Sequence, residues 1–226
     1  MTAPVIADCG DSALRITSAA ATPDERWREV HRIAAAVDAA GMTGVLGTIA
    51  TYDAVLSEFD CATVSHHDIR AAVSELDSTP FGTARPPRTF EVPVVYGGEH
   101  GPDLAVVATL LDVSEADVIA RHCARPLTMR CYGSPGGAPM LDGPDFGLPI
   151  PRRASPRASV PAGAVAVAGH QAVVSARPAP GGWQVLGRTP VTLVDIASDP
   201  ISAYAPGDTF QFVPISAAEW GDHHEL

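Results

Sequence analysis

The residues best suited to chemistry lie between Pro151 and Arg188, where polar side chains alternate with turn signals. Two short apolar strands are predicted here, at 165–168 and 183–186, and a proline–glycine turn opens each of them. Glycine lets a ligand approach the main chain closely, and β-rich domains usually place a binding site at the ends of strands. The candidate polar side chains are Arg152, Arg153, Arg157, His170, Gln171 and Arg188.

Arginine suits anion binding because its planar guanidinium group presents several N–H donors to a carboxylate or a phosphate. Arg152, Arg153 and Arg157 are therefore candidates for an anion site. The same residues also fit a solvated edge at which Asp or Glu side chains pair with them. Arg188 lies in the sequence Gly-Arg-Thr-Pro, which predicts a turn that would hold its side chain in a better defined place.

A glycine-rich loop, 97–101, is predicted between a strand and a helix. In that topology, backbone N–H groups such as those of Gly97 and Gly98 can hold an anion at the start of the helix. The loop has neither GxGxxG nor GK[ST] order, so a plain connecting loop is the alternative.

His122 ends a predicted helix that Ser114 and Asp117 cap. A cation is favoured at that end of a helix, so the position fits a C-terminal capping histidine. An imidazole with an ordinary pKa also titrates near neutrality, which makes His122 the best histidine candidate for general acid–base catalysis.

The composition of the 226-residue chain excludes several classes of function. A net charge of −11 argues against nucleic acid or an anionic membrane as partner, since both need clustered cations. No lysine is present, which excludes a Schiff-base or P-loop lysine. His66 and His67 are adjacent and the four cysteines lack CxxC spacing, so we expect no metal site and reduced thiols. There is no signal-like leader and no apolar run of about 18 residues, so we expect a cytoplasmic protein without a transmembrane helix.

The N-terminal domain, 1–88, is predicted to be a ferredoxin-like α/β sandwich within an α+β fold. Five strands are expected, at 5–7, 13–17, 45–49, 54–59 and 90–96. The last of these either joins the first sheet or begins the second domain. A helix that is capped at Thr22 and ends near Gly41 is expected to bury one stripe of side chains. That stripe is Trp27, Val30, Ile33, Ala34 and Val37. A second helix is expected at 68–76, with a proline-rich linker at 78–88.

The second domain, 89–226, is predicted to carry two short helices and then a run of strands. The helices, at 103–111 and 114–121, are expected to pack on the domain rather than to bind DNA, because the chain is acidic and the first helix is apolar. From Ile150 onward, short strands between Gly/Pro turns predict a closed or nearly closed β-barrel. The tail from Ala217, which contains Trp220, is expected to be frayed or bound to a partner.

Three blocks of the chain resemble the allophanate hydrolase subunit 1 family, which includes the B subunit of bacterial 5-oxoprolinase and the sporulation-kinase inhibitor of bacilli. These blocks are VPVVYGGEHGPDLAVVA (92–108), VPAGAVAVAGHQ with PGGWQVLGRTP (160–171 and 180–190) and PGDTFQFVPI (206–215). The resemblance implies a cyclophilin-like β-barrel for the second domain. Family members usually carry a His-Ser pair where this chain has His122-Cys123.

The chain departs from the family pattern in the loop that is expected at 133–141. Members typically read GFxPGFPYL there, and this chain has Ser134, Ala138 and Met140 in place of the three aromatic residues. Aromatic side chains supply much of a pocket's contact area, so the loop is expected to be roomier or more mobile, which bears on whether the usual substrate is bound. Members also commonly have Gln-Thr-Gly where this chain has Gln171-Ala172-Val173.

The resemblance implies a subunit of an ATP-dependent enzyme that cleaves a lactam or a linear amide, either 5-oxoproline to glutamate or allophanate. The implied partners are a subunit 2-like protein and a third, hydrolase subunit. In this hypothesis His122, Gln171, Arg188 and Arg157 act on the substrate. Backbone N–H groups near Gly97–Gly98 and Gly181–Gly182 would hold phosphate or carboxylate. The alternative is a regulator that binds a histidine kinase without turnover, and a third possibility is a scaffold that only stabilises its partner.

Overall fold

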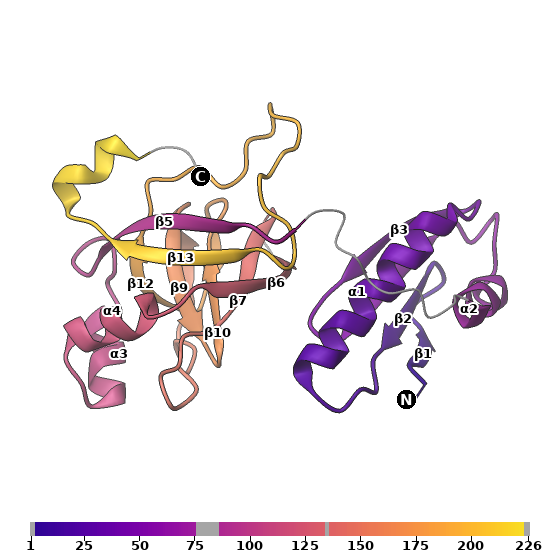
Figure 1. Ribbon diagram of the computed structural model, residues 1–226, viewed down its shortest axis with the longest axis horizontal. Coiled ribbons are helices and arrows are strands. Elements are labelled where there is room, and N and C mark those ends of the chain that lie inside the picture. The colour runs from indigo at the N-terminus through magenta and orange to yellow at the C-terminus, as the bar shows by residue number, and fades with distance from the viewer. Residues whose placement is uncertain (1–2, 76–85, 134–135, 224–226) are drawn as a thin grey trace. The chain divides into compact units, whose positions relative to one another are not determined.

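The computed structural model describes residues 3–75, 86–133 and 136–223, and the chain divides into two compact units, 1–86 and 87–226 (Figure 1). The division lies two residues before the boundary that the sequence predicted. Residues 78–85 of the predicted linker lie outside the described residues. None of the described helices is long and apolar enough to cross a membrane.

The N-terminal unit is a four-stranded antiparallel sheet in the order β1-β2-β4-β3 with two helices. Its elements are β1 (Val5–Asp8), β2 (Ala13–Thr17), α1 (Pro23–Ala40), β3 (Val45–Ala50), β4 (Ala54–Phe59) and α2 (His66–Glu75). The path from β2 to α2 follows the predicted ferredoxin-like order, and β1 takes the edge position that the last strand of that fold occupies. The strand predicted at 90–96 therefore does not belong to this sheet.

Helix α1 follows the sequence prediction closely. Thr22 and Glu25 form the reciprocal capping box, and Gly41 ends the helix in the left-handed conformation. All five residues of the predicted stripe are buried. Four of them, Val30, Ile33, Ala34 and Val37, share a core with Leu14 and Val55 of the sheet and Ile69 of α2, so both helices cover the same face of the sheet.

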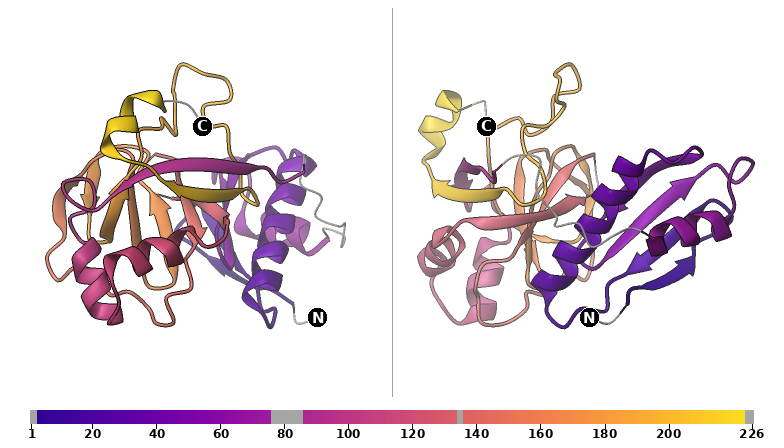
Figure 2. Two further views of the ribbon diagram at one scale, coloured as in Figure 1. Left: turned by 60° about the vertical axis from the view of Figure 1, so that its left-hand side comes forward. Right: turned by 45° about the vertical axis from the view of Figure 1, so that its right-hand side comes forward.

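The C-terminal unit is a closed barrel of seven strands in the order β10-β7-β6-β13-β5-β12-β9, seen from two further sides in Figure 2. The barrel strands are β5 (Thr89–Tyr96), β6 (Leu127–Gly133), β7 (Ala138–Asp142), β9 (Ala164–Ala168), β10 (Gln171–Val174), β12 (Gln184–Arg188) and β13 (Thr209–Pro214). A separate two-stranded ribbon joins β8 (Arg157–Val160) to β11 (Ala179–Gly181). Strand β5, which corresponds to the strand predicted at 90–96, lies between β12 and β13 and therefore belongs to the C-terminal unit. It runs antiparallel to β12 and parallel to β13.

Two helices, α3 (Leu104–Leu111) and α4 (Glu115–Cys123), pack on this barrel. Leu104 and Val107 of α3 and Val118 of α4 are buried in the barrel core, as the helix-packing prediction required. The last described element is a short 3₁₀ helix, η1 (Ala217–Asp222), where the sequence analysis expected a frayed or partner-bound tail.

The segment predicted as a loop at 133–141 is largely strand. Its second half is β7, which pairs with β6 and β10, and Ala138 and Leu141 are fully buried there. The expected roomier loop is therefore wrong for 138–141, because these residues pair with strands on both sides and form part of the barrel wall. Ser134 lies outside the described residues.

A substitution at Gly101 tests how closely the loop before α3 packs against β12. A Cβ atom at this position would lie 1.9 Å from the carbonyl oxygen of Leu186, so Gly101→Ala must displace backbone. We expect the free energy of unfolding, measured by urea denaturation, to fall by about 2 kcal/mol. Gly221→Ala is the control, since its Cβ would meet no atom within 4 Å. Equal stability of the two variants would contradict the close approach.

Candidate functional site

The carboxylate of Asp103 is the centre of a buried polar cluster in the C-terminal unit. Its side chain is only 1% exposed, and it accepts hydrogen bonds from Arg153 at 2.7 Å and from two nitrogens of Arg157 at 2.7 and 2.8 Å. The backbone N–H of Val185 donates to the same carboxylate at 2.8 Å. We call Asp103, Arg153 and Arg157 the aspartate cluster.

Local backbone geometry brings Asp103 to this position. The N–H of Asp103 donates to the carbonyl of Val185, so the loop and strand β12 exchange two hydrogen bonds. Gly97 is also tied to β12, because its N–H donates to the carbonyl of Leu186 at 3.0 Å. Asp103 precedes α3 but makes no side-chain capping bond, which leaves both carboxylate oxygens for the arginines and Val185.

The same region gathers three of the predicted substrate-binding residues. Arg157 pairs with Gly181 across the β8–β11 ribbon, and the N–H of Arg153 donates to the carbonyl of Gly182 at 2.8 Å. The guanidinium group of Arg152 lies over the ring of Trp183, 5.9 Å from its centre. Arg157, Gly181 and Gly182 therefore lie together, as the hypothesis of one site requires.

The structure nevertheless gives Arg157 a different partner from the one predicted. The carboxylate that it binds belongs to the chain's own Asp103, so the alternative of pairing with an acidic side chain describes it better, but this carboxylate is buried rather than at a solvated edge. Two arginines share one carboxylate, which leaves the cluster with one net positive charge. In the described part of the chain, two buried atoms beside this cluster have no hydrogen-bond partner, namely Nε of Arg153 and Oε1 of Gln184.

The aspartate cluster keeps its carboxylate ionised. Burial alone would raise the pKa of Asp103, but hydrogen bonds from Arg157 and Val185, together with the charges of both arginines, outweigh it and lower that pKa below 3.8. The same carboxylate raises the pKa of Arg157. The cluster is thus an internal ion pair at all physiological pH values.

A second group of side chains lies around Trp220 of η1. The His100 ring stacks on the indole with centroids 4.9 Å apart, and the guanidinium group of Arg188 lies 5.3 Å from its centre. Arg188 is the last residue of β12 rather than part of the predicted turn, and its Nε donates to the carbonyl of Ala162 at 2.9 Å. Trp220 thus contacts both Arg188 and His100 of the 97–101 loop. We call Arg188, His100 and Trp220 the tryptophan cluster.

The predicted anion site at Gly97 and Gly98 does not fit its surroundings. The N–H of Gly97 already donates within the barrel, and Oε2 of Glu115 lies 3.8 Å from the place of a Cβ atom on Gly97. The neighbouring Glu99 is 91% exposed in its side chain and adds a second carboxylate. Two negative charges beside the loop would repel a phosphate, so the alternative of a plain connecting loop describes this segment.

His122 is buried rather than free to titrate near neutrality. Its side chain is fully buried, a 2.7 Å hydrogen bond joins its Nδ1 to the hydroxyl of Tyr96, and the Phe212 ring packs 4.4 Å away. Burial lowers the pKa of His122 to about 3, so the expected ordinary pKa is wrong. Cys123, at the position where family members carry serine, lies with its Sγ 3.4 Å from the same tyrosine hydroxyl.

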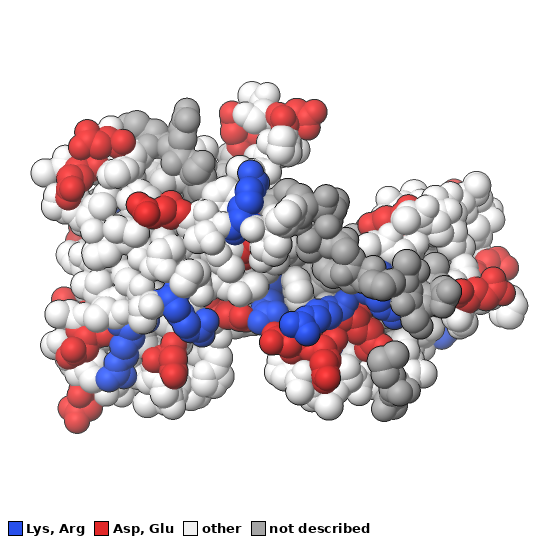
Figure 3. Space-filling view, in the orientation of Figure 1, with Lys and Arg blue, Asp and Glu red and all other residues white. Residues whose placement is uncertain are grey.

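The remaining predicted residue, Gln171, begins β10 opposite Asp142 and Ala168. No hydrogen bond among the described residues joins its side chain to either cluster. Within residues 3–75, 86–133 and 136–223, no group of three or more His, Cys, Asp or Glu side chains lies close enough to hold a metal ion. On the part of the barrel that Figure 3 shows, arginines are scattered among acidic side chains rather than gathered in one basic patch.

Sequence reasoning missed the roles of Asp103 and His100. Asp103 looked like the start of a helix, and its arginine partners lie 50 and 54 residues further along the chain. No local spacing signals such a contact. His100 was visible only as part of a glycine-rich loop, and its stacking partner Trp220 lies in the tail that was expected to be frayed or partner-bound.

Comparison with known proteins gives a consistent picture. Residues 4–204 match the family described as carboxyltransferase domain, subdomains C and D. The chain is 31% identical to the B subunit of 5-oxoprolinase from Bacillus subtilis over 97% of this chain and 96% of that protein. It is 44% identical to the B subunit of 5-oxoprolinase from Escherichia coli O157:H7 over 56% of this chain and 58% of that protein. The crystal structure of TTHA0988 is similar at a TM-score of 0.78 and 29% identity over 91% of this chain, which spans 40% of that longer protein.

Replacing Asp103 by Asn tests the aspartate cluster. Removing one partner of a buried ion pair leaves uncompensated charge, so we expect Asp103→Asn to lower the free energy of unfolding by about 3 kcal/mol at pH 7. Because the pKa of Asp103 is lower in the folded chain than in the unfolded one, its stabilising effect is lost as the pH falls below about 4. The difference between wild type and variant in urea denaturation should therefore narrow in acid. Asp112→Asn, at an exposed position, is the control and should change stability by less than about 0.5 kcal/mol.

The buried state of His122 has a separate pH signature. Its charged form is disfavoured in the folded chain, so stability should decline as the pH drops below the unfolded value of about 6.5 toward the folded pKa of about 3. His122→Gln should flatten this slope between about pH 6.5 and pH 4. In NMR spectra the imidazole signal that this variant loses should not shift over the same range. A titration of that signal near neutrality would instead support the acid–base role.

Proposed function

Because the chain belongs to the carboxyltransferase-domain family and is similar over nearly its whole length to a 5-oxoprolinase component, we propose that it is one subunit of an ATP-dependent enzyme that converts 5-oxoproline to glutamate. The observation that carries this proposal is the 31% identity to the Bacillus subtilis protein over 97% of the chain. That relative is named as one lettered subunit of its enzyme, which implies that the enzyme has further subunits. We accordingly propose a subunit 2-like partner and a third, hydrolase subunit for this chain.

The proposed reaction sets a clear demand on the binding site. Water adds to the lactam carbonyl carbon and the C–N bond breaks, so the single carboxylate of the substrate becomes two carboxylates and an amine in the product. Such a site needs a cation that is not already neutralised by an acid. Arg188 meets this need, since among the described residues its guanidinium group contacts a backbone carbonyl and an indole ring but no carboxylate. The excess positive charge of the aspartate cluster is a second candidate for holding an anion.

The residues of this chain do not fit an ATP site of their own. The sequence has no lysine and no P-loop, and two carboxylates lie beside Gly97 and Gly98. We therefore derive no ATP-dependent step through this chain, and the proposed requirement for ATP belongs to the complete assembly. Gln171 remains a candidate for the substrate pocket, whereas the side chain of His122 is fully buried and would act only through Tyr96, to which it is hydrogen-bonded.

Reconstitution with the subunit 2-like and hydrolase partners from the same genome tests the proposal. We expect glutamate to form from 5-oxoproline only when ATP and all subunits are present. Arg188→Gln should raise the KM for 5-oxoproline about tenfold or more, because a hydrogen bond to a charged group contributes about 1.5–3 kcal/mol. Arg28→Gln, on the exposed face of α1, is the matched control and should leave KM unchanged. A complete assembly without ATP-dependent glutamate formation would overturn the proposal, and binding to a histidine kinase without turnover would favour the regulator.

A further inference from the structure

Trp220 anchors the short helix η1 to the barrel. It is the one residue of this six-residue segment that is not exposed. The polar contacts of η1 and its cap stay within the segment, where Ser216 and Glu219 bond to each other. The indole of Trp220, in contrast, reaches the barrel at His100 and Arg188. The attachment of η1 and the surroundings of Arg188 are therefore linked through one side chain.

The contacts of Arg188 leave the outer edge of its guanidinium group unpaired. Its Nε donates to the carbonyl of Ala162 at 2.9 Å, which fixes the side of the group next to the aliphatic stem. The centre of the Trp220 ring lies 5.3 Å from its Cζ atom. Among the residues that the structure describes, neither Nη nitrogen of Arg188 has a hydrogen-bond partner. Two Nη donors in one plane match the two oxygens of a carboxylate.

His100 holds the indole from a second segment of the chain. Its ring is stacked on that of Trp220, with 26° between the two planes, and its side chain is only 20% exposed. The loop that carries His100 is tied to β12, because the N–H of Gly97 donates to the carbonyl of Leu186 at 3.0 Å. The indole is therefore placed from the same strand that carries Arg188.

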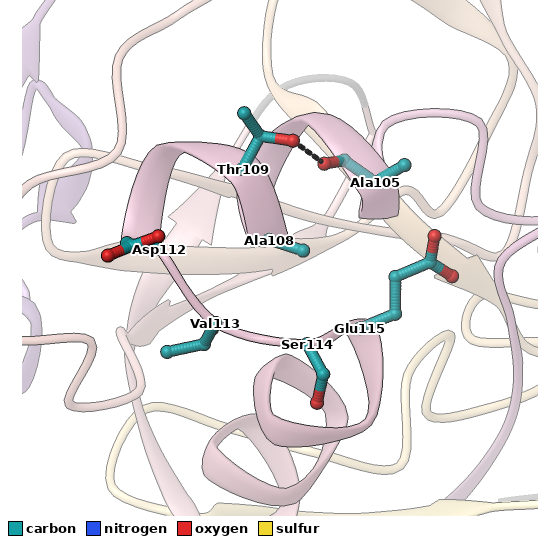
Figure 4. Close-up of a pocket in the computed structure, with 7 residues that line it drawn as sticks. All are labelled: Ala105, Ala108, Thr109, Asp112, Val113, Ser114 and Glu115. Atoms are coloured by element: carbon teal, nitrogen blue, oxygen red, sulfur yellow. Dashed lines mark hydrogen bonds between the residues drawn. The ribbon is translucent and has the colours of Figure 1, made fainter.

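The hollow between α3 and the start of α4 offers no comparable anion site (Figure 4). Its lining includes the carboxylates of Asp112 and Glu115 and contains no arginine. Negative charge at this place would repel a carboxylate. The carboxylate of a substrate is therefore disfavoured in the hollow, in contrast to the unpaired edge of Arg188.

We propose that Trp220 is a positioning residue for the carboxylate of the substrate. Its indole, braced by His100, keeps the guanidinium group of Arg188 in one orientation with both Nη groups free. This inference rests on the proposed role of Arg188 in binding 5-oxoproline. A long side chain loses rotamer freedom when it binds a ligand, and a side chain that is already ordered loses less. Trp220 thus strengthens substrate binding through Arg188 rather than by its own contact.

Kinetics of the reconstituted assembly test this role. Trp220→Leu should raise the KM for 5-oxoproline about three- to tenfold and leave kcat nearly unchanged, because Arg188 must then be ordered when the substrate binds. Trp220→Phe should keep most of the wild-type affinity, since a phenyl face also attracts a guanidinium group. In the Arg188→Gln background, Trp220→Leu should have no further effect on KM, because Trp220 acts through Arg188. Ala218→Ser, at an exposed residue of η1, is the matched control and should leave KM unchanged.

NMR of the chain without partners gives a readout that does not need turnover. The Nε–H signal of Arg188, identified by its loss in Arg188→Gln, should exchange with water faster in Trp220→Leu than in wild type, because the bond to Ala162 is no longer held in place. Unchanged exchange in that variant would overturn the positioning role. A lower melting temperature of Trp220→Leu with an unchanged KM would also overturn it, since Trp220 would then be only a structural anchor of η1.

Failure of the proposed function gives a different result. A complete wild-type assembly that forms no glutamate would overturn that function and, with it, the substrate named for Arg188. The exchange measurement on the chain alone would still decide whether Trp220 holds the guanidinium group. An active assembly in which the effects of Trp220→Leu and Arg188→Gln on KM simply add would instead overturn the positioning role alone.

Discussion

The carboxylate of Asp103 holds three separate segments of the barrel unit together. It ends the loop before α3, receives two arginines from the segment before and within β8, and accepts a backbone N–H from β12. A buried carboxylate is stable only when a nearby cation compensates its charge and donors bind its lone pairs. Here the two arginines supply the positive charge, and together with Val185 they donate four hydrogen bonds. The positions of the loop, the ribbon and the strand are therefore not independent of one another.

Strand β12 connects this cluster to the tryptophan cluster. Its second residue, Val185, contacts Asp103, and its last residue, Arg188, lies over Trp220. Between them, Leu186 accepts the N–H of Gly97, which places the loop that carries His100. One short strand thus fixes the positions of Asp103, Gly97 and Arg188 relative to one another. A rigid strand positions such groups better than the turn that was predicted for Arg188.

Many polar groups that looked available in the sequence are used inside the fold. Arg157 neutralises Asp103, His122 is buried against Tyr96 and Phe212, and Gly97 donates within the barrel. Among the described residues, the fold leaves groups of a different kind at its surface, namely an arginine without an acidic partner, Arg188, and two exposed apolar side chains of α3, Val106 and Leu110. This division agrees with the proposal that the chain is one subunit of a larger enzyme.

The sequence by itself determined the elements that depend on neighbours a few positions apart. The capping boxes at Thr22 and Ser114, the buried stripe of α1 and the strands of the first sheet were predicted from such local patterns. The resemblance also identified the family and the barrel. Only the tertiary structure decided that β5 belongs to the barrel, that 138–142 is a strand, and that Asp103 lies between Arg153 and Arg157. The reason is physical, because these contacts join residues far apart in the chain and form only when the barrel closes.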